Sequence, residues 1–338
     1  MEEDRSFIDK ISIKESDYCL AYSFRLVKYL YQANFTMWGL EQVRQGKNEY
    51  FCQNIRERDG NIIVSVDKDI CFVVLENWER VLPKSRLAFQ SDFFRVLDLL
   101  SIAYCCEKRN RAADAEPISA ICFSIYDYMD LRGTDRTAAN KHNAKKSIVN
   151  VLELLCAITV QCDSFDSKLI SGYRYSRDVF TVELSAQCSQ SFHADRLKMK
   201  YPLSLFQVDG NNCNSCAYIL GHKLAETGTG RINPRRGPND TISVRSLLAI
   251  CPSFIQKPAV KGRNPKNLYR NIFCPLQHAL DCLLEFGILS VPASYDFEGT
   301  TFQASDMQKL LSHISFTSLL DIKVRFVLDG VPKPYFYT

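Results

Sequence analysis

The sequence predicts an α+β fold, mostly helical, in which two tandem winged helix-turn-helix domains follow a small mixed α/β N-terminal region. Two observations lead to this prediction: three helices with apolar periodicity are followed by alternating strands between residues 91 and 184, and the same order recurs between residues 215 and 302. We place the N-terminal region at 1–84, the first winged-helix domain at 85–190 and the second at 196–328.

The N-terminal region is predicted to combine one helix and a β-hairpin. Apolar spacing favours a helix around Leu20–Gln32. Asp59 and Gly60 form a typical two-residue hairpin turn, which leads into a strand at Asn61–Val66, and a further strand follows at Cys71–Leu75. No pattern in this region indicates chemistry, so we treat it as an accessory segment.

The first winged helix is predicted to begin with two helices. Ser91–Cys106 carries apolar side chains at helical spacing, which indicates a helix that faces the core. Ser124 and Asp127 form a capping-box pattern at the start of a short helix that runs through Leu131, and Gly133 closes it.

A third helix, capped by Thr134 or Asp135, is predicted to run to about Leu155 and to have two different halves. Its C-terminal half is apolar and suits a core. Its first three turns carry polar and basic residues, namely Arg136, Asn140, Lys141, His142, Lys145 and Lys146. Because the third helix of a winged helix-turn-helix enters the major groove of DNA, this half is expected to contact bases.

A wing is predicted directly after the third helix. Ile158–Cys162 and Phe180–Leu184 both alternate apolar and polar residues, and the loop Asp163–Tyr173 lies between them. We expect the two strands to pair as a hairpin that can touch the DNA backbone.

The second half of the chain repeats this order. Helices are predicted at Ser215–Glu226, Ser243–Cys251 and Asn264–Gly287. Pro275 lies inside the third of these helices and should kink it, since proline has no backbone N–H. Ile288–Phe302 is predicted to form the second wing.

Positive charge is concentrated between Arg196 and Arg270, although the whole chain has a net charge of only +4. This segment holds thirteen Lys and Arg residues against three acidic ones, a local balance of +10. The asymmetry favours a nucleic-acid surface, because each neutralised phosphate releases counterions; a solvated basic face without a ligand is the alternative. Within the segment, the connector Thr227–Thr241 carries three arginines suited to phosphate, namely Arg231, Arg235 and Arg236.

Composition and the N-terminal residues indicate a cytoplasmic protein that contacts no membrane. No apolar run of about 18 residues occurs, and the acidic start Met1–Arg5 lacks the layout of a secretion signal. The chain has 14 cysteines, most of which flank apolar residues, as Cys122, Cys156 and Cys282 do. We therefore expect buried, reduced thiols.

The CxxC pair Cys213 and Cys216, with His222 nearby, is the pattern in this sequence that most suggests a metal. A structural zinc site needs about four ligands. No second CxxC or HxxxH supplies the others. We therefore expect no metal and no cofactor, and a zinc site at these residues is the alternative.

The sequence lacks the motifs of several enzyme classes, and it predicts a binding protein without catalytic residues. No GxxxxGK[ST], GxSxG or HExxH occurs. The five histidines include no His-x-His pair of the kind that holds the metal of a DNA-nicking tyrosine enzyme. The acidic pairs Asp67/Asp69 and Asp163/Asp166 lie in predicted turns, where turn chemistry explains them. A metal-dependent nuclease is the enzymatic alternative.

Five segments of the chain resemble replication initiator proteins of bacterial plasmids, phages and integrative elements. In the second half the resemblance lies in Asp209–Glu226, Ile242–Leu248 and Cys274–Asp281, and in the first half in Tyr126–Gly133 and Leu152–Val160. It covers roughly residues 90–328, and its motifs are patterns of helix packing.

The resemblance implies binding to repeated or palindromic origin DNA, a dimer–monomer switch with a homodimer, and recruitment of a host helicase or helicase loader. It implies two sets of base readers: Arg136, Asn140, Lys141 and Lys145 in the first domain, and Lys266, Asn267 and Arg270 in the second. The complete predicted surface for double-stranded DNA is Arg136, Asn140, Lys141, Lys145, Lys146, Arg231, Arg235, Arg236, Arg245, Lys257, Lys261, Arg263, Lys266, Asn267 and Arg270. A winged-helix transcriptional regulator or partition factor is the alternative within the same binding class.

Overall fold

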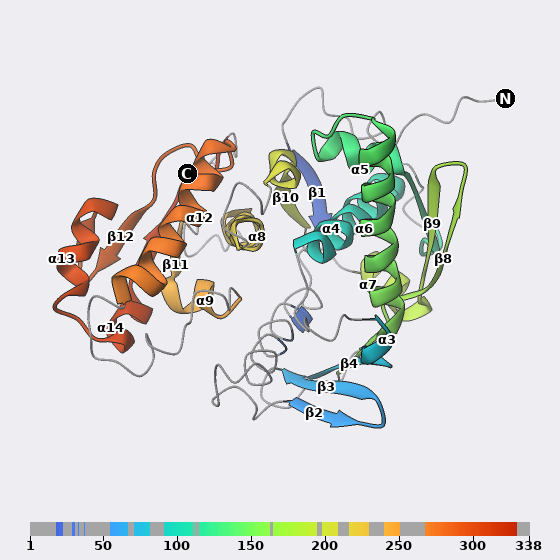
Figure 1. Ribbon diagram of the computed structural model, residues 1–338, viewed down its shortest axis with the longest axis horizontal. Coiled ribbons are helices and arrows are strands. Elements are labelled where there is room, and N and C mark those ends of the chain that lie inside the picture. Colours follow the sequence, from blue (N-terminus) through green and yellow to red (C-terminus); the bar gives the residue numbers. More distant parts are fainter. Residues whose placement is uncertain are drawn as a thin grey trace. The chain divides into compact units, whose positions relative to one another are not determined.

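The computed structural model divides the chain into two compact units, Met1–Lys198 and Met199–Thr338 (Figure 1). The residues that the structure describes are 18–22, 29–30, 33, 37, 55–66, 71–81, 91–109, 111, 115–162, 165–194, 198–208, 216–229, 240–250 and 268–329. No helix within these ranges is both long and apolar enough to cross a membrane. The fold is α+β, as predicted, with more β-structure than the sequence indicated.

The helix predicted at Leu20–Gln32 is wrong at its start, because Tyr18–Tyr22 form strand β1. The two tyrosines of this segment suit an extended strand. Tyr29 and Leu30 are helical, and most of the remaining residues of the predicted helix lie outside the described part of the chain.

The predicted N-terminal hairpin is confirmed. Strand β2 (Ile55–Arg58) pairs with β3 (Asn61–Val66), and β3 pairs with β4 (Cys71–Leu75), all antiparallel. Asp59 and Gly60 have φ angles of 50° and 75°, as the two central residues of a type I′ turn require. The short helix α3 follows at Trp78–Val81.

The first two predicted helices are also confirmed. Helix α4 (Ser91–Arg109) is buried on nearly all sides, since Arg95, Asp98 and Ser101 are buried together with its apolar residues. After strand β5 (Ala120–Ser124) comes α5 (Ile125–Leu131), which begins with the expected capping box.

The third helix, α6 (Ala138–Ala157), begins later than predicted. Its N-cap is Thr137, whose hydroxyl accepts a hydrogen bond from the backbone N–H of Asn140, and not Thr134 or Asp135. Arg136 therefore precedes the helix instead of lying in its first turn.

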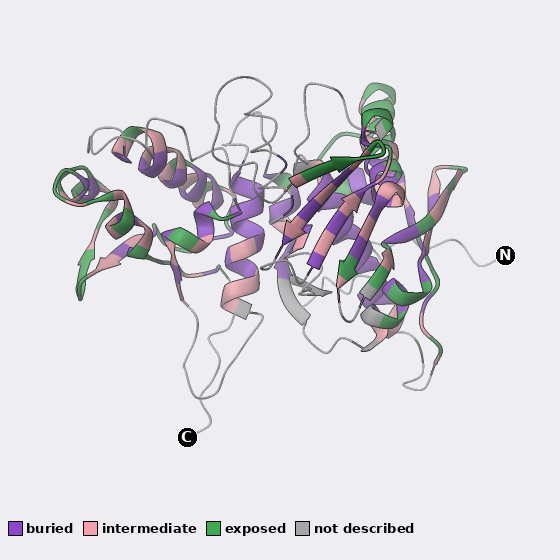
Figure 2. Cartoon of the chain, turned by 90° about the horizontal axis from the view of Figure 1, so that it is seen from below, coloured by how far each residue is buried: buried purple, intermediate pink, exposed green. Residues whose placement is uncertain are grey.

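Two antiparallel sheets flank these helices. The first has the order β2-β3-β4-β6-β7, where β6 is Ile158–Cys162 and β7 is Phe165–Lys168. The second has the order β5-β9-β8, where β8 is Ile170–Ser176 and β9 is Val179–Leu184. Helix α7 (Ala186–Ala194) follows β9. Buried and more exposed positions alternate along these strands (Figure 2).

The predicted wing, in which Ile158–Cys162 pairs with Phe180–Leu184, is wrong. The first segment belongs to β6, which pairs with β4 and β7, whereas the second belongs to β9, which pairs with β5 and β8. The hairpin directly after α6 is instead β6–β7, and the next one is β8–β9, joined by Arg177 and Asp178 with φ angles of 49° and 68°. A two-residue turn matches the twist of paired strands.

The second unit contains the helices predicted for it, with shifted ends. After β10 (Lys198–Pro202) and the 3₁₀ segment η2 (Leu203–Gln207) comes α8 (Ala217–Thr229). Strand β11 (Thr241–Ser243) leads into α9 (Val244–Leu248).

The helical geometry changes just before Pro275, where a kink was predicted. The described part of the third helix consists of a π-helical turn, η4 (Tyr269–Phe273), followed by α12 (Cys274–Glu285). The backbone N–H of Cys274 donates to the carbonyl of Tyr269, five residues earlier. Pro275 lies at the start of α12, where a missing N–H is tolerated.

The segment predicted to form the second wing contains a hairpin of β12 (Ser294–Phe297) and β13 (Thr300–Phe302), but the sheet around it was not foreseen. Its order is β11-β14-β12-β13, so β14 (Lys323–Arg325) separates the hairpin from β11. The sequence prediction also missed three helical segments between β13 and β14, namely η5 (Ala304–Asp306), α13 (Met307–Leu311) and α14 (Phe316–Asp321).

Candidate nucleic-acid interface

The N-terminal half of α6 is a polar surface exposed to solvent. From Arg136 to Lys146 each residue is exposed or half-buried, and the first fully buried position is Ile148. The first turn contains no acidic residue. Between residues 136 and 150 the chain carries four basic residues and no acidic one. The predicted division of this helix into a polar half and a core half is therefore confirmed.

Arg136 is held beside the start of α6 by Asp130. Its Nε lies 3.0 Å from Oδ1 of Asp130, and its Nη2 contacts Oδ2, so the pair is bidentate. The guanidinium carbon also lies 5.1 Å from the ring centre of Tyr126. The hydrogen bond and charge of Asp130 raise the pKa of Arg136 above its ordinary value. This cation is thus partly neutralised by its own protein.

Asp178, at the tip of the β8–β9 hairpin, connects the hairpin to α6. Its Oδ2 accepts hydrogen bonds from Nζ of Lys141 at 2.5 Å and from the Tyr126 hydroxyl at 3.1 Å. Its Oδ1 accepts from the Tyr175 hydroxyl at 2.8 Å. The backbone carbonyl of Asp178 also accepts from the N–H of Ile125 at 2.8 Å. The hairpin tip is therefore fixed against both α5 and α6.

These contacts shift the titration of the two charged partners in opposite directions. The hydrogen bond from Lys141, together with that from Tyr175, lowers the pKa of Asp178 below its ordinary value. The hydrogen bond to Asp178 raises the pKa of Lys141. The side chains of Lys141 and Asp178 are 34% and 31% exposed, so solvent screens the pair, and it positions the hairpin more than it stabilises the fold.

Lys145 faces the same hairpin one turn further along α6. Its Nζ lies 4.2 Å from the ring centre of Tyr175, within the range of a cation–π interaction. Lys141 and Lys145 are four residues apart and therefore lie on one face of the helix. That face is directed toward the β8–β9 hairpin, which lies beside α6 in Figure 1.

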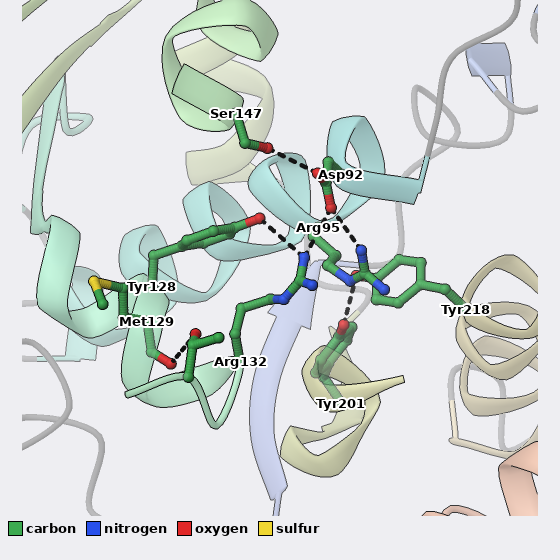
Figure 3. A network of polar contacts seen from close by, with 9 residues as sticks. Asp92, Arg95, Tyr128, Met129, Arg132, Ser147, Tyr201 and Tyr218 are labelled. Atoms are coloured by element: carbon green, nitrogen blue, oxygen red, sulfur yellow. Dashed lines mark hydrogen bonds and ion pairs between the residues drawn. The ribbon is translucent and has the colours of Figure 1, made fainter. Parts of the chain in front are cut away.

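Asp92 fixes the orientation of α6 against the rest of the unit (Figure 3). Its Oδ1 accepts from Arg95 at 2.6 Å and from Arg132 at 2.9 Å, and its Oδ2 accepts from Ser147 at 2.8 Å. Burial alone would raise the pKa of Asp92, but the charges of the two arginines outweigh it and the net pKa is lowered. One carboxylate thus joins α4, the end of α5 and the middle of α6.

The second unit offers fewer exposed cations in its described part. Arg245 is exposed but its Nη2 lies 2.9 Å from Oδ1 of Asp321. Arg270, in η4, is exposed. Lys223 lies 2.5 Å from Glu226 and is half-buried. The polyanion surface predicted for this half of the chain therefore depends on its other basic residues.

Most of those residues lie outside the described part of the chain. Eight predicted DNA contacts lie outside the described residues, namely Arg231, Arg235, Arg236, Lys257, Lys261, Arg263, Lys266 and Asn267. Their assignment stays a prediction. The seven that are described lie in the two units, five of them at α6.

The prediction of buried cysteine thiols is only partly confirmed. Cys282 is buried and Cys156 is half-buried, but Cys122 is exposed on β5, where its Sγ lies 3.5 Å from Oγ1 of Thr181. Successive side chains of a strand point to opposite faces, so Cys122 points to the exposed face while its two apolar neighbours point to the buried one. This explains the wrong prediction that Cys122 is buried. Cys216 and His222 are buried, and Cys213 lies outside the described residues. In the described part of the chain, no group of three or more residues is arranged to hold a metal.

The chain is similar to solved structures but not to any family model or curated protein. No family model matches the sequence, and no curated protein matches it. Among solved structures, the chain is similar to that of the Pi initiator protein in complex with iteron DNA, with 11% identity and a TM-score of 0.46 over 79% of this chain and 100% of that chain. At this level of likeness, the similarity assigns no function to the chain.

Sequence reasoning missed three side chains that shape the α6 surface. Tyr126, Tyr175 and Asp178 bind or stack on the predicted cations, yet they come from α5 and from the hairpin. A signal existed only for Asp178, since aspartate is common in tight turns, but the correct hairpin pairing was needed to recognise it. His142 and Asn143 were not selected as contacts although both are exposed on α6.

Proposed function

We propose that this chain is a sequence-specific double-stranded DNA-binding protein, and that α6 with the β8–β9 hairpin of the first unit forms its main contact surface. The observation that carries the proposal is the exposed, acid-free N-terminal half of α6, which is oriented by Asp92 and flanked by the hairpin. A helix of about 10–12 Å diameter fits the major groove, which is about 12 Å wide.

The order of elements supports a winged-helix reading of the first unit. Helix α4, strand β5 and helices α5 and α6 follow one another, and the hairpin β8–β9 comes after β6 and β7. Strand β9 lies between β5 and β8 in their sheet. A third helix next to a hairpin is the arrangement in which the helix contacts bases and the hairpin contacts phosphates. The second unit repeats the order of α8, β11, α9, α12 and the hairpin β12–β13, which supports a tandem arrangement.

The role proposed for this binding is initiation of replication of a plasmid, phage or other mobile element. This part rests on the resemblance of the sequence to replication initiators. It includes recognition of repeated or palindromic origin sites and recruitment of a host helicase or loader. The protein would act by binding, without catalytic activity of its own. Supplying the protein in trans to an origin-bearing circle tests this role, since a transcriptional regulator or partition factor would not support copying.

Salt dependence of binding tests the DNA-binding proposal directly. In gel-shift titrations of the full chain on a mixed-sequence duplex, log affinity should fall steeply with log salt, because phosphate contacts release counterions. Replacing both Lys145 and Arg177, which is exposed at the tip of the β8–β9 hairpin, by alanine should reduce the slope by about 1.8, since each phosphate contact contributes about 0.9.

The matched control removes two cations from the N-terminal hairpin instead. Arg56 and Arg58 are exposed on β2, and the double alanine variant should retain the wild-type slope. A flat salt dependence of the wild type, or equal slopes for both double variants, would contradict the proposed surface.

A further inference from the structure

Helix α6 has two polar faces with different tasks. Lys141 and Lys145 face the β8–β9 hairpin, where Asp178 and Tyr175 bind them. Ala139, Asn143 and Lys146 lie on another face, at spacings of four and three residues, and all three are exposed. The face toward solvent is therefore not the one that carries most of the predicted base readers.

The two asparagines in the first turns of α6, Asn140 and Asn143, also differ in whether their side chains are already bonded within the protein. The side-chain amide of Asn140 donates a hydrogen bond to the backbone carbonyl of Asp135 at 3.0 Å, so it is used within the cap of the helix. Asn143 is exposed, and within the described part of the chain no hydrogen bond involves its side chain. Its amide can thus offer one donor and one acceptor together to a partner.

We infer that Asn143 and Lys146, with Ala139, determine which DNA sequence the protein selects, and that Asn140, Lys141 and Arg136 instead hold the surface in place. The inference rests on the proposed DNA binding. An asparagine pairs with N6 and N7 of adenine, a lysine with O6 and N7 of guanine, and an alanine methyl packs on the methyl of thymine. The preferred site should therefore contain neighbouring thymine, adenine and guanine contacts.

The spacing of these side chains fits consecutive base pairs. Ala139 and Lys146 are seven residues apart, which corresponds to about 10 Å along a helix. Three base-pair steps also span about 10 Å, at 3.4 Å per step. The stripe is thus long enough to contact about three or four base pairs when the N-terminal half of α6 lies in the groove.

The chemistry of the face favours DNA over a protein partner. Residues 136–150 carry four cations and no acid, which complements a polyanion. Protein interfaces are commonly anchored by large aromatic or aliphatic side chains. The exposed large hydrophobic residue among the described residues is Val291, which belongs to the second unit and not to α6.

Selection from a randomised duplex library by the full chain tests the inference. The wild type should enrich a short motif that includes an adenine. Asn143→Ala should lose the preference for that adenine by at least about fivefold, and Lys146→Ala should lose a guanine preference by a similar factor. Binding to a mixed-sequence duplex should change little for Asn143→Ala, since a neutral side chain contributes no counterion release.

Two further asparagine variants complete the experiment. Asn150→Ala, an exposed position two turns beyond Asn143, serves as the matched control and should enrich the wild-type motif. Asn140→Ala should also enrich that motif, and a loss of adenine preference in this variant but not in Asn143→Ala would overturn the assignment. An unchanged motif in Asn143→Ala would overturn it as well, while salt-dependent binding by the wild type would leave the DNA-binding proposal intact. Tryptophan fluorescence verifies that each variant is folded.

Discussion

The substitution Asp92→Asn removes one negative charge from the centre of the first unit while it keeps the size of the side chain. In the wild type, one carboxylate oxygen accepts from Arg95 and Arg132, at 2.6 and 2.9 Å. The side chain of Arg95 is only 2% exposed and that of Arg132 is 18% exposed. An asparagine oxygen can still accept from both arginines, but it offers them no charge.

The expected loss of stability follows from the strength of these two hydrogen bonds. Bonds to charged groups contribute about 1.5–3 kcal/mol and neutral ones about 0.5–1.5 kcal/mol, so each bond loses about 1–1.5 kcal/mol. Asp92 is 35% exposed, and screening by solvent reduces the total. We therefore expect the free energy of unfolding of this unit to fall by about 2 kcal/mol.

Urea titration followed by tryptophan fluorescence measures this loss. Both tryptophans of the chain, Trp38 and Trp78, belong to the first unit, so the signal reports on that unit. Asp135→Asn changes an exposed acid that makes backbone contacts to Asn140 and Thr137, and it serves as the control. The transition midpoint should fall for Asp92→Asn with an unchanged m-value, and equal midpoints for the two variants would refute the role given to the carboxylate.

The pH dependence of the difference gives an independent check. The pKa of Asp92 is lowered in the folded state, so its stabilising effect is present above its unfolded pKa, near 3.9, and is lost as pH falls through the folded pKa. The difference between wild type and Asp92→Asn should be constant around neutral pH and should shrink below about pH 4. A difference that grew on acidification would contradict this sign.

Two further predictions concern the tip of the β8–β9 hairpin. Arg177→Asn should raise the free energy of unfolding by about 0.5–1 kcal/mol in urea titrations, because a left-handed backbone costs most L-residues about 1–2 kcal/mol and asparagine less. It should also lower the salt slope of DNA binding by about one. Arg174 lies in the strand, so the control Arg174→Asn should show no gain in stability. Asp178→Asn should speed hydrogen exchange of the β8–β9 amides, because it weakens the contacts of the hairpin tip to Lys141 and Tyr175. The amides of α4 should show no comparable change. Equal exchange of the hairpin amides in the variant and the wild type would show that the tip is held by other contacts.

The features that local chemistry determines could be predicted from the sequence. The capping box of Ser124 and Asp127 was found because both partners lie within one turn. The turn at Asp59 and Gly60 was found because these residues tolerate positive φ. An irregularity of the helix near Pro275 was expected because proline cannot donate the hydrogen bond that an α-helix requires, and a π-helical turn precedes it.

The features that depend on distant partners could not be predicted. The turn at Arg177 and Asp178 begins with an arginine, which is uncommon at positive φ, so the alternation of the neighbouring strands led to the wrong pairing. Strand β14 is only three residues long and gives little periodic signal. It is placed by its pairing with β11 and β12.

The candidate surface shows the same limit. Charge and helical periodicity predicted a helix with a polar half and an apolar half, and α6 has both. They could not separate the cations that face solvent from those that face the hairpin, since Asp178 lies 37 residues from Lys141 in sequence. Only the fold shows that Lys141 already has an acidic partner.

The pairing of β4 with β6 makes the candidate DNA-binding helices an insertion between two adjacent strands. Strand β4 ends at Leu75 and β6 begins at Ile158, so closing this connection costs about 4 kcal/mol of chain entropy for a loop of about 80 residues. During synthesis, the strands β2–β4 cannot complete their sheet until β6 has left the ribosome. Removing the first 84 residues would therefore do more than delete an accessory segment: it would leave β6 as an open edge, prone to pair with other chains.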